Sequence, residues 1–158
     1  MAILVHESLE VWRFPRQEIV NTDAKLETLW ARVSVGHNKR ILFCSLYRPP
    51  SGTGTQLTAD LDQLDSELET MLSRHEGIVV ICGDANCDWR LLTGNATGAQ
   101  FRTLLDKYDL SQVNTSPTFD TGSILDVIVT NKPESVVAHD VLHCYFSRHK
   151  FTRALIRV

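Results

Sequence analysis

An acid and an amide stand at the end of an apolar run near the middle of the chain, where Asp84 and Asn86 follow Gly83. The run before them, residues 78–82, predicts a strand that is buried on both faces, and Gly83 allows the backbone to turn as that strand ends. Polar side chains that leave a buried strand are held rigidly, as a catalytic group must be. Asp84 and Asn86 are therefore candidate catalytic residues, and an ordinary Asp/Asn turn is the alternative.

Three further places carry side chains suited to moving protons and positioning water. Tyr47 and Arg48 follow directly on another apolar run, residues 41–46. Asp126 lies inside a third apolar run, where an ionised carboxylate is costly unless another group pairs with it. His149 comes just before the last strand-like run of the chain. Together with Asp84 and Asn86, these residues form a candidate site for acid–base chemistry.

Four short motifs, in chain order, resemble those of the endonuclease/exonuclease/phosphatase superfamily: Tyr-Arg-Pro-Pro at 47–50, Gly-Asp-x-Asn at 83–86, Leu-Asp-x-Ile at 125–128 and Ser-x-His at 147–149. The first and third are most similar to the endonuclease domain of non-LTR retrotransposon reverse-transcriptase polyproteins. The resemblance implies an α/β fold, the four-layer α/β/β/α sandwich of this superfamily. It also implies hydrolysis of phosphodiesters with Mg²⁺, or Mn²⁺, as the cofactor.

The resemblance further implies a role for each residue of the candidate site. Asp84 would position or deprotonate the attacking water, and Asn86 and Tyr47 would donate hydrogen bonds to the phosphate. His149 would contact the phosphate, and Asp126 would hold its ring in the required tautomer. Arg48, Asn86 and Arg148 would bind the substrate.

The chain departs from the family pattern at two places. Family members carry an asparagine and a metal-binding glutamate on their first strands, whereas residues 1–5 look like a strand that normally follows both. We therefore expect a domain that is truncated at its N-terminus. The family also has Ser-Asp-His where this chain has Ser147, Arg148 and His149. The metal site is thus expected to be incomplete, and its ligands stay unknown.

Arg148 has two interpretations. A guanidinium can pair bidentately with phosphate, so it could compensate for a missing metal. It cannot bind or acidify water as Mg²⁺ does, and it repels any cation nearby. We favour the second interpretation, mutational drift in an inactive copy, and expect the isolated chain to be weak or inactive.

Length and composition fit one partial domain that covers residues 1–158. A chain of 158 residues can bury a real core, and 43% hydrophobic and 22% charged residues are ordinary for a globular protein. No apolar stretch has the length of a membrane span, and the start of the chain lacks the pattern of a signal peptide. We expect an intracellular protein of the nucleus or cytoplasm, without a membrane partner.

The net charge of −3 does not by itself indicate a nucleic-acid-binding protein. Its distribution is more informative, because residues 141–158 contain Arg148, Lys150, Arg153 and Arg157 and no acid. Such a basic edge can steer a DNA phosphate backbone to one face. The acidic residues of segment 60–69 are best interpreted as a solvated surface.

Periodicity predicts helices and strands in alternation. Leucines recur at spacings of three and four over residues 57–72, and a similar apolar pattern covers 101–108, so both segments should be amphipathic helices. Strands are expected at 2–6, 28–35, 40–47, 77–83, 123–130, 135–142 and 151–158. Helices outside packed sheets make an α/β sandwich. Loss of the first strands would expose a sheet edge and permit self-association.

Three functions are compatible with these observations. The first is a metal-dependent endonuclease domain of retroelement origin that nicks DNA and is impaired in this chain. The second is a phosphoesterase acting on small or lipid phosphates, and the third is a non-catalytic nucleic-acid-binding or interaction remnant. The first predicts that the five catalytic candidates converge at one end of the sheets, with Asp126 hydrogen-bonded to His149.

Overall fold

A mixed six-stranded sheet forms the centre of the structure, with the strand order β1-β2-β3-β4-β6-β5. The computed structural model describes residues 1–15, 22–36, 38–50, 53–90 and 96–158. Strands β3 and β4 are parallel, and the other neighbouring pairs of this sheet are antiparallel. In sheet order the strands are β1 (Glu10–Arg13), β2 (Glu27–Ser34), β3 (Arg40–Tyr47), β4 (Ile78–Asp84), β6 (Asp126–Thr130) and β5 (Ser111–Gln112).

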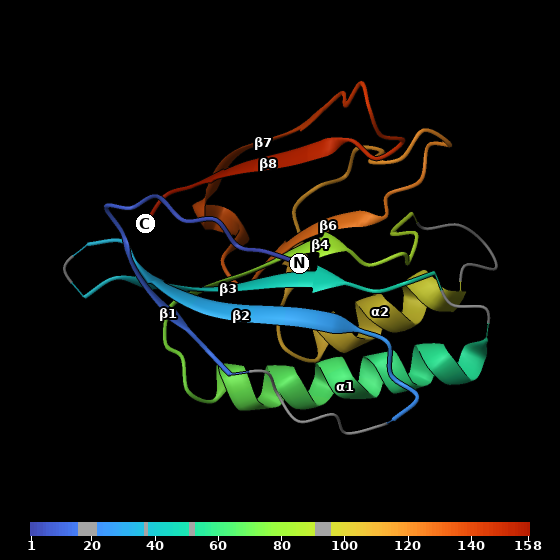
Figure 1. The fold of residues 1–158 in the computed structure, drawn as a ribbon, viewed down its shortest axis with the longest axis horizontal. Helices are drawn as coiled ribbons and strands as arrows, with labels where there is room; N and C mark the ends of the chain where they lie inside the picture. The colour runs from blue at the N-terminus through green and yellow to red at the C-terminus, as the bar shows by residue number, and fades with distance from the viewer. Residues whose placement is uncertain (16–21, 37, 51–52, 91–95) are drawn as a thin grey trace.

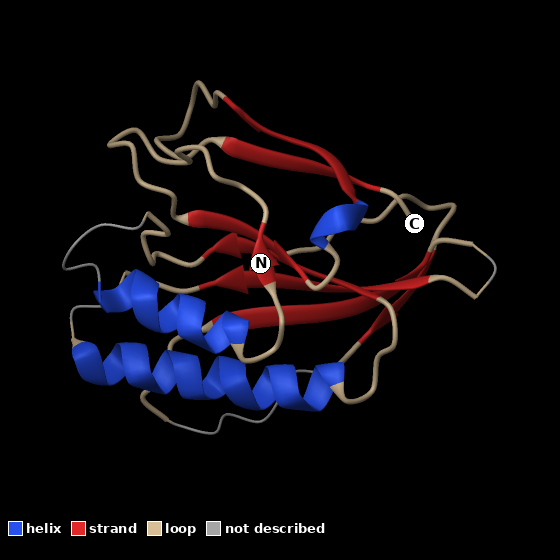
Figure 2. Cartoon of the chain, turned by 180° about the vertical axis from the view of Figure 1, so that it is seen from behind, coloured by secondary structure: helices blue, strands red, loops and turns tan. Residues whose placement is uncertain are grey.

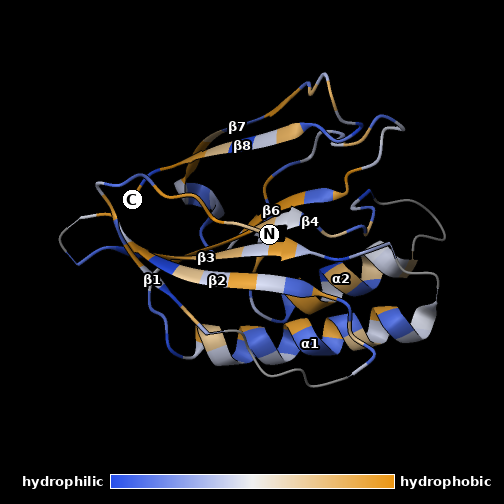
Figure 3. Ribbon diagram, in the orientation of Figure 1, coloured by the Kyte–Doolittle hydropathy of each residue, from blue (hydrophilic) through white to orange (hydrophobic). Residues whose placement is uncertain are grey.

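Helices α1 (Gly54–Leu72) and α2 (Ala96–Asp106) cover one face of this sheet (Figure 1, Figure 2). Helix α1 begins where Thr53 Oγ1 accepts a hydrogen bond from Gln56 N at 3.3 Å. Hydrophilic and hydrophobic residues alternate around α1 (Figure 3), as its leucine spacing predicts. The helix-side core is apolar and includes Leu57, Leu64, Leu68, Leu42, Leu46, Val79, Ile81, Val127 and Val129. No helix within the described ranges is long and apolar enough to cross a lipid bilayer.

Strands β7 (Val136–Leu142) and β8 (Phe151–Ile156) form a separate antiparallel sheet over the opposite face (Figure 1). Ala154 and Ile156 of β8 pack on a second apolar cluster of the central sheet, formed around Ile41, Val80 and Ile128. The molecule is therefore layered as helices, large sheet and small sheet. This arrangement confirms the predicted α/β sandwich.

The start of the chain differs from the prediction. Residues 2–6 form no strand, and the Leu4 side chain is 95% exposed. A strand requires a neighbour with unpaired backbone groups. The free edge of β2 pairs instead with β1, where Glu10 lies opposite Ser34. Apolar composition alone could not reveal this choice of partner. The short strands β1 and β5 were not predicted.

Candidate active site

Tyr47, Asp84 and Asp126 form one row across the central sheet. Tyr47 is the register partner of Asp84 between β3 and β4, and Asp84 is the partner of Asp126 between β4 and β6. Residues directly opposite each other on paired strands point to the same face. By alternation this is the face that carries Val80 and Ile128, which is covered by the small sheet. Strands β3 and β4 end at this row and β6 begins there, so the polar side chains lie together at one end of the sheet.

His149 reaches this row from the segment between β7 and β8. Its Nδ1 atom lies 3.0 Å from Asp126 Oδ2, so the hydrogen bond expected from the sequence is present. Its Nε2 atom lies 3.9 Å from Asp84 Oδ2. That separation is too long for a direct hydrogen bond, but a ligand atom that contacts both groups fits between them. The imidazole therefore links the two carboxylates of the row.

Thr118 holds this part of the site together, although no sequence motif singled it out. Its fully buried hydroxyl oxygen accepts hydrogen bonds from Leu125 N at 2.9 Å and Asp126 N at 3.0 Å. Its carbonyl oxygen accepts a bond from Lys150 N at 2.8 Å. Thr118 thus fastens the backbone beside Asp126 to the backbone beside His149. A Thr/Ser-rich loop offers no spacing by which sequence could have identified it.

The turn after β4 depends on Gly83 and Asn86, because both have a positive φ. Gly83 has a φ of +145°, and a Cβ atom there would lie 1.8 Å from Leu46 O. Asn86 has a φ of +47°, and its backbone N–H donates to Asp84 Oδ1 at 2.9 Å. Its side-chain nitrogen donates to Arg48 O at 2.8 Å, and the Asn86 side chain also hydrogen-bonds to Asp84. Close backbone approach and these local bonds fix the direction of Asp84 and Asn86.

Arg48 does not fit the substrate-binding role expected for it. Only 1% of this residue is exposed, and its Nε atom forms an ion pair with Asp60 Oδ2 at 3.1 Å. Its Nη1 atom lies 3.4 Å from Asn86 O and 3.5 Å from Ala85 O. A guanidinium enclosed beneath the turn cannot contact a substrate. Arg48 instead supports the Asp84–Asn86 turn from below.

Arg148 lies beside the site and remains accessible. Its side chain is 66% exposed, and its Nε atom is 3.8 Å from Asp120 Oδ2. Its guanidinium sits 4.7 Å from the centre of the Phe119 ring, which in turn contacts the His149 ring edge-on at 4.7 Å. The positive charge thus flanks His149 on the outer side of the row. Tyr47 is 36% exposed, so its side chain is also within reach of a ligand.

The electrostatics of the row favour a basic Asp84. Burial raises the pKa of the Asp84 carboxyl, the nearby Asp126 charge raises it further, and hydrogen bonding by Asn86 and the proximity of His149 partly offset this. A carboxylate with a raised pKa accepts a proton from water more readily. Perturbed carboxylates of this kind are typical of active sites.

Asp84, Asp126 and His149 also form a group of cation donors. Each offers one ligand atom, and these atoms lie within 4.8 Å of one another. Two carboxylates and an imidazole fit a divalent cation with positions left for water. They do not select Mg²⁺, which prefers oxygen ligands throughout. Within the described ranges no other such group occurs.

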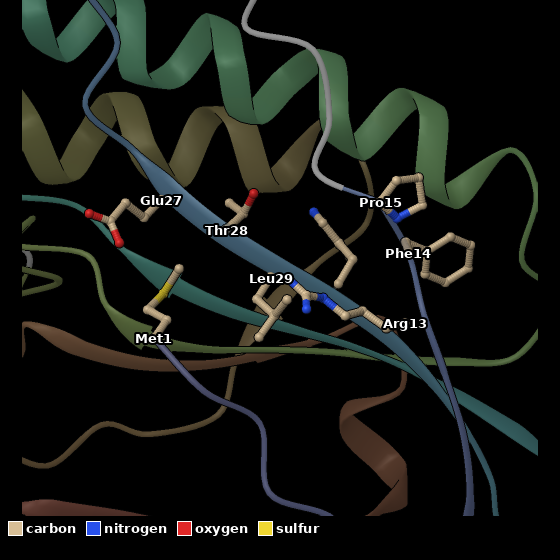
Figure 4. A pocket seen from close by; sticks show the side chains of 8 residues that line it. Met1, Arg13, Phe14, Pro15, Glu27, Thr28 and Leu29 are labelled. Carbon is tan, nitrogen blue, oxygen red and sulfur yellow. The ribbon is translucent and has the colours of Figure 1, made fainter.

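A cavity of about 340 Å³ adjoins the row on the β2 side, where Glu27 is the register partner of Tyr47. Figure 4 shows Met1 and Glu27 at one end of this cavity and Arg13 and Phe14 at the other. The cavity is lined by residues of the chain start, β1 and β2 and carries charged groups of both signs, Arg13 and Glu27.

Solved structures share this fold, and several of them are described as endonuclease/exonuclease/phosphatase family proteins. A protein of this family from Leptotrichia buccalis is 19% identical, with 83% of this chain and 53% of that chain covered and a TM-score of 0.59. A functionally unknown conserved protein from Enterococcus faecalis is 14% identical, with 94% and 64% covered and a TM-score of 0.63. The human Nocturnin catalytic domain with bound sulfate is 12% identical, with 81% and 53% covered and a TM-score of 0.56.

At these identities the likeness shows the fold alone, and the chain spans about half the length of the Leptotrichia protein. A comparison with curated proteins finds no match. Fold and sequence motifs together define a member of the endonuclease/exonuclease/phosphatase superfamily. More particularly, residues 41–153 match the endonuclease-reverse transcriptase family, and the chain belongs to that family.

Proposed function

We propose that the site hydrolyses phosphodiester bonds of DNA with the help of a divalent cation. The observation that carries this proposal is the linked set Asp126, His149 and Asp84, with separations of 3.0 and 3.9 Å. It places a fixed imidazole and a basic carboxylate around one small space. In that space the imidazole can contact a phosphate oxygen while the carboxylate accepts a proton from the attacking water.

Each side chain has a distinct part in this reaction. Asp84 takes a proton from water as the water oxygen attacks phosphorus. The bond from phosphorus to the leaving oxygen breaks, its electron pair stays on that oxygen, and the oxygen takes up a proton from solvent. Asp126 Oδ2 accepts a hydrogen bond from His149 Nδ1 and so sets the ring orientation, with Nε2 turned toward the phosphate. The Tyr47 hydroxyl and the Asn86 amide donate to phosphate oxygens. A divalent cation held by the carboxylates of Asp84 and Asp126 would supply charge relief on the phosphate, with His149 Nε2 left for the phosphate itself.

DNA is the proposed substrate, and retroelement DNA nicking the proposed role. The Tyr-Arg-Pro-Pro and Leu-Asp-Val-Ile motifs support this assignment, as does the match to a family described as endonuclease-reverse transcriptase. The exposed Arg148 beside His149 adds a positive charge where a phosphate backbone would pass. Such a protein would work in the nucleus or the cytoplasm.

A non-catalytic nucleic-acid-binding function is the second candidate. It is favoured by Arg148, which stands where the family carries a carboxylate and which repels a cation. We therefore expect slow nicking at most. Binding of DNA should persist even where cleavage is weak.

Nicking of supercoiled plasmid with Mg²⁺ or Mn²⁺, and with chelator, tests both candidates. We expect weak metal-dependent nicking that Asp84→Ala abolishes and Arg148→Asp increases, whereas Asp62→Asn, on the exposed side of α1, leaves it unchanged. DNA binding measured in parallel separates the candidates. If neither the parent nor Arg148→Asp nicks or binds DNA, the proposal is wrong.

We also propose that copies of the chain associate through the small sheet. Within the described ranges β8 pairs with β7 alone, and its exposed residues Phe151 and Leu155 are 54% and 61% accessible. A strand with one unpaired edge and exposed apolar side chains favours pairing with a second copy. Sedimentation velocity should show concentration-dependent dimers that Leu155→Lys reduces and that Leu4→Lys, at an exposed site outside the sheets, does not. A monomer at all concentrations would overturn this.

A further inference from the structure

A second polar cavity lies at the end of the central sheet remote from the active-site row. Its volume is about 500 Å³, and its lining includes the charged residues Arg32, Arg40, Arg74 and Glu76 together with His75. Arg40 begins β3, whereas Tyr47 ends it, so the two ends are roughly 23 Å apart at 3.3 Å per residue. The cavity is therefore separate from the active site.

The arginines of this cavity come from elements that the fold brings together. Arg32 lies opposite Leu42 and Arg40 lies opposite Ser34, so Arg32 and Arg40 are diagonal neighbours on β2 and β3. Both share the face of Leu42, the face covered by the helices. Arg74 joins them from just beyond the end of α1.

These guanidinium groups form no ion pair in the described part of the chain, although one carboxylate, that of Glu76, lines the same cavity. In contrast, Arg48, Arg90, Arg148 and Arg153 each pair with an aspartate. Neighbouring like charges repel one another, so an anion bound between the guanidinium groups would reduce their mutual repulsion.

His75 lines the cavity as an uncharged ring whose N–H group is already used within the protein. Its Nε2 atom lies 3.2 Å from Ile78 O, so Nε2 carries the proton and donates. Burial lowers the pKa of the His75 ring, and the nearby Arg32 and Arg40 charges lower it further. The turn is also tight, since Gly77 has a φ of +146° and a Cβ there would lie 2.9 Å from Arg40 O and 3.2 Å from His75 Nε2. The backbone thus holds His75 close to Arg40.

We propose that this cavity binds a phosphate group through the guanidinium groups of Arg32, Arg40 and Arg74, which line it together. The planar guanidinium fork matches phosphate oxygens bidentately, and several forks around one space favour an anion with more than one negative charge. Inorganic phosphate and a nucleic-acid backbone present the same oxygens, so the cavity suits either source. The bound group is not the phosphate that reacts at Asp84, since the cavity opens at the other end of the sheet and on the helix side.

Titration of the isotope-labelled protein with inorganic phosphate, followed through backbone amide shifts, tests the proposal. We expect saturable shifts at residues 32, 40 and 73–77 that are weakened at least tenfold in the Arg32→Gln/Arg40→Gln double variant. Arg13→Gln removes the same charge from exposed β1 and should have no effect. Arg40→Lys keeps the charge but loses the fork, so it should weaken binding as well. Phosphate should also raise the melting temperature of the parent and not that of the double variant.

A parallel titration with a single-stranded oligonucleotide distinguishes the two sources of phosphate. Tighter binding of the oligonucleotide, with competition by inorganic phosphate, supports a nucleic-acid backbone. Equal or weaker binding supports a free phosphate group. Shifts that never saturate, or that Arg13→Gln weakens as much as the double variant does, would overturn the proposal. Asp84→Ala should leave these shifts intact, so the result is independent of nuclease activity.

Discussion

Arg48 and Asp60 form a buried ion pair directly beneath the candidate active site. Arg48 Nε lies 3.1 Å from Asp60 Oδ2, and both side chains are almost fully enclosed. The other oxygen of Asp60 accepts hydrogen bonds from Lys25 N at 2.6 Å and Leu26 N at 2.9 Å. One carboxylate of α1 thus connects the start of β2 to the residue that supports the Asp84–Asn86 turn.

Removal of one partner of this pair should be strongly destabilising. Arg48→Met leaves the Asp60 charge buried without its cation, which typically costs about 3–5 kcal/mol. Urea unfolding should show this loss in the free energy of unfolding. The matched control is Arg153→Met, which breaks the exposed pair with Asp140 and should cost less than about 1 kcal/mol. Similar losses in both variants would contradict the assigned role of Arg48.

Asp84→Asn should stabilise the fold while it removes activity. The raised pKa of Asp84 means that the folded state binds the proton more tightly than the unfolded chain does, so ionisation destabilises the fold as pH rises through that pKa. Asparagine resembles the neutral form and still accepts the bond from Asn86 N. At pH 7 we expect a gain of about 0.5–2 kcal/mol, a common size for stabilising substitutions.

The pH dependence supplies the check on this prediction. Thermal unfolding from pH 7 downward should show the advantage of Asp84→Asn shrinking through the raised pKa and disappearing below the ordinary value of 3.8. Asp62→Asn, at an exposed position of α1, should give no such gain. An advantage that grows on acidification would show that burial does not penalise the Asp84 charge.

Arg148→Asp should strengthen the binding of Mn²⁺ or Mg²⁺. The change removes a cation beside His149 and adds an oxygen ligand at the same position. We expect about a tenfold gain in affinity by calorimetry, which corresponds to about 1.4 kcal/mol. Lys150→Asp changes the net charge equally one residue beyond His149 and serves as the control. Equal gains in both variants would indicate general charge attraction and no added ligand.

Gly83→Ala should disrupt the turn that carries Asp84. The added methyl group would lie 1.8 Å from Leu46 O, and the φ of +145° is unfavourable for any other residue. A loss of at least about 3 kcal/mol, or failure to fold, is expected by urea unfolding and circular dichroism. Gly54→Ala, at the start of α1 with no atom within 4 Å of the added carbon, should be nearly neutral. Tolerance of alanine at position 83 would show that strands β3 and β4 can separate there.

Local pattern in the sequence determined the elements and the principal residues of the candidate site. Leucine spacing predicted α1, and apolar runs predicted β3, β4 and β6, because periodic burial and backbone hydrogen bonding are local properties of a helix or strand. Motif order brought Tyr47, Asp84, Asp126 and His149 into one candidate site. The structure joins them through strand register and through the bond between Asp126 and His149.

Tertiary structure alone decided which groups meet. The strand expected at residues 2–6 is absent because β1 occupies the edge of β2, a competition that no single segment can reveal. Arg48 proved to be a buried support because Asp60, twelve residues along the chain, faces it from α1. The roles of Thr118, Arg32 and Arg40 likewise depend on neighbours that are distant in sequence. Pairing, burial and charge balance depend on packing between elements, and packing is set by the whole chain.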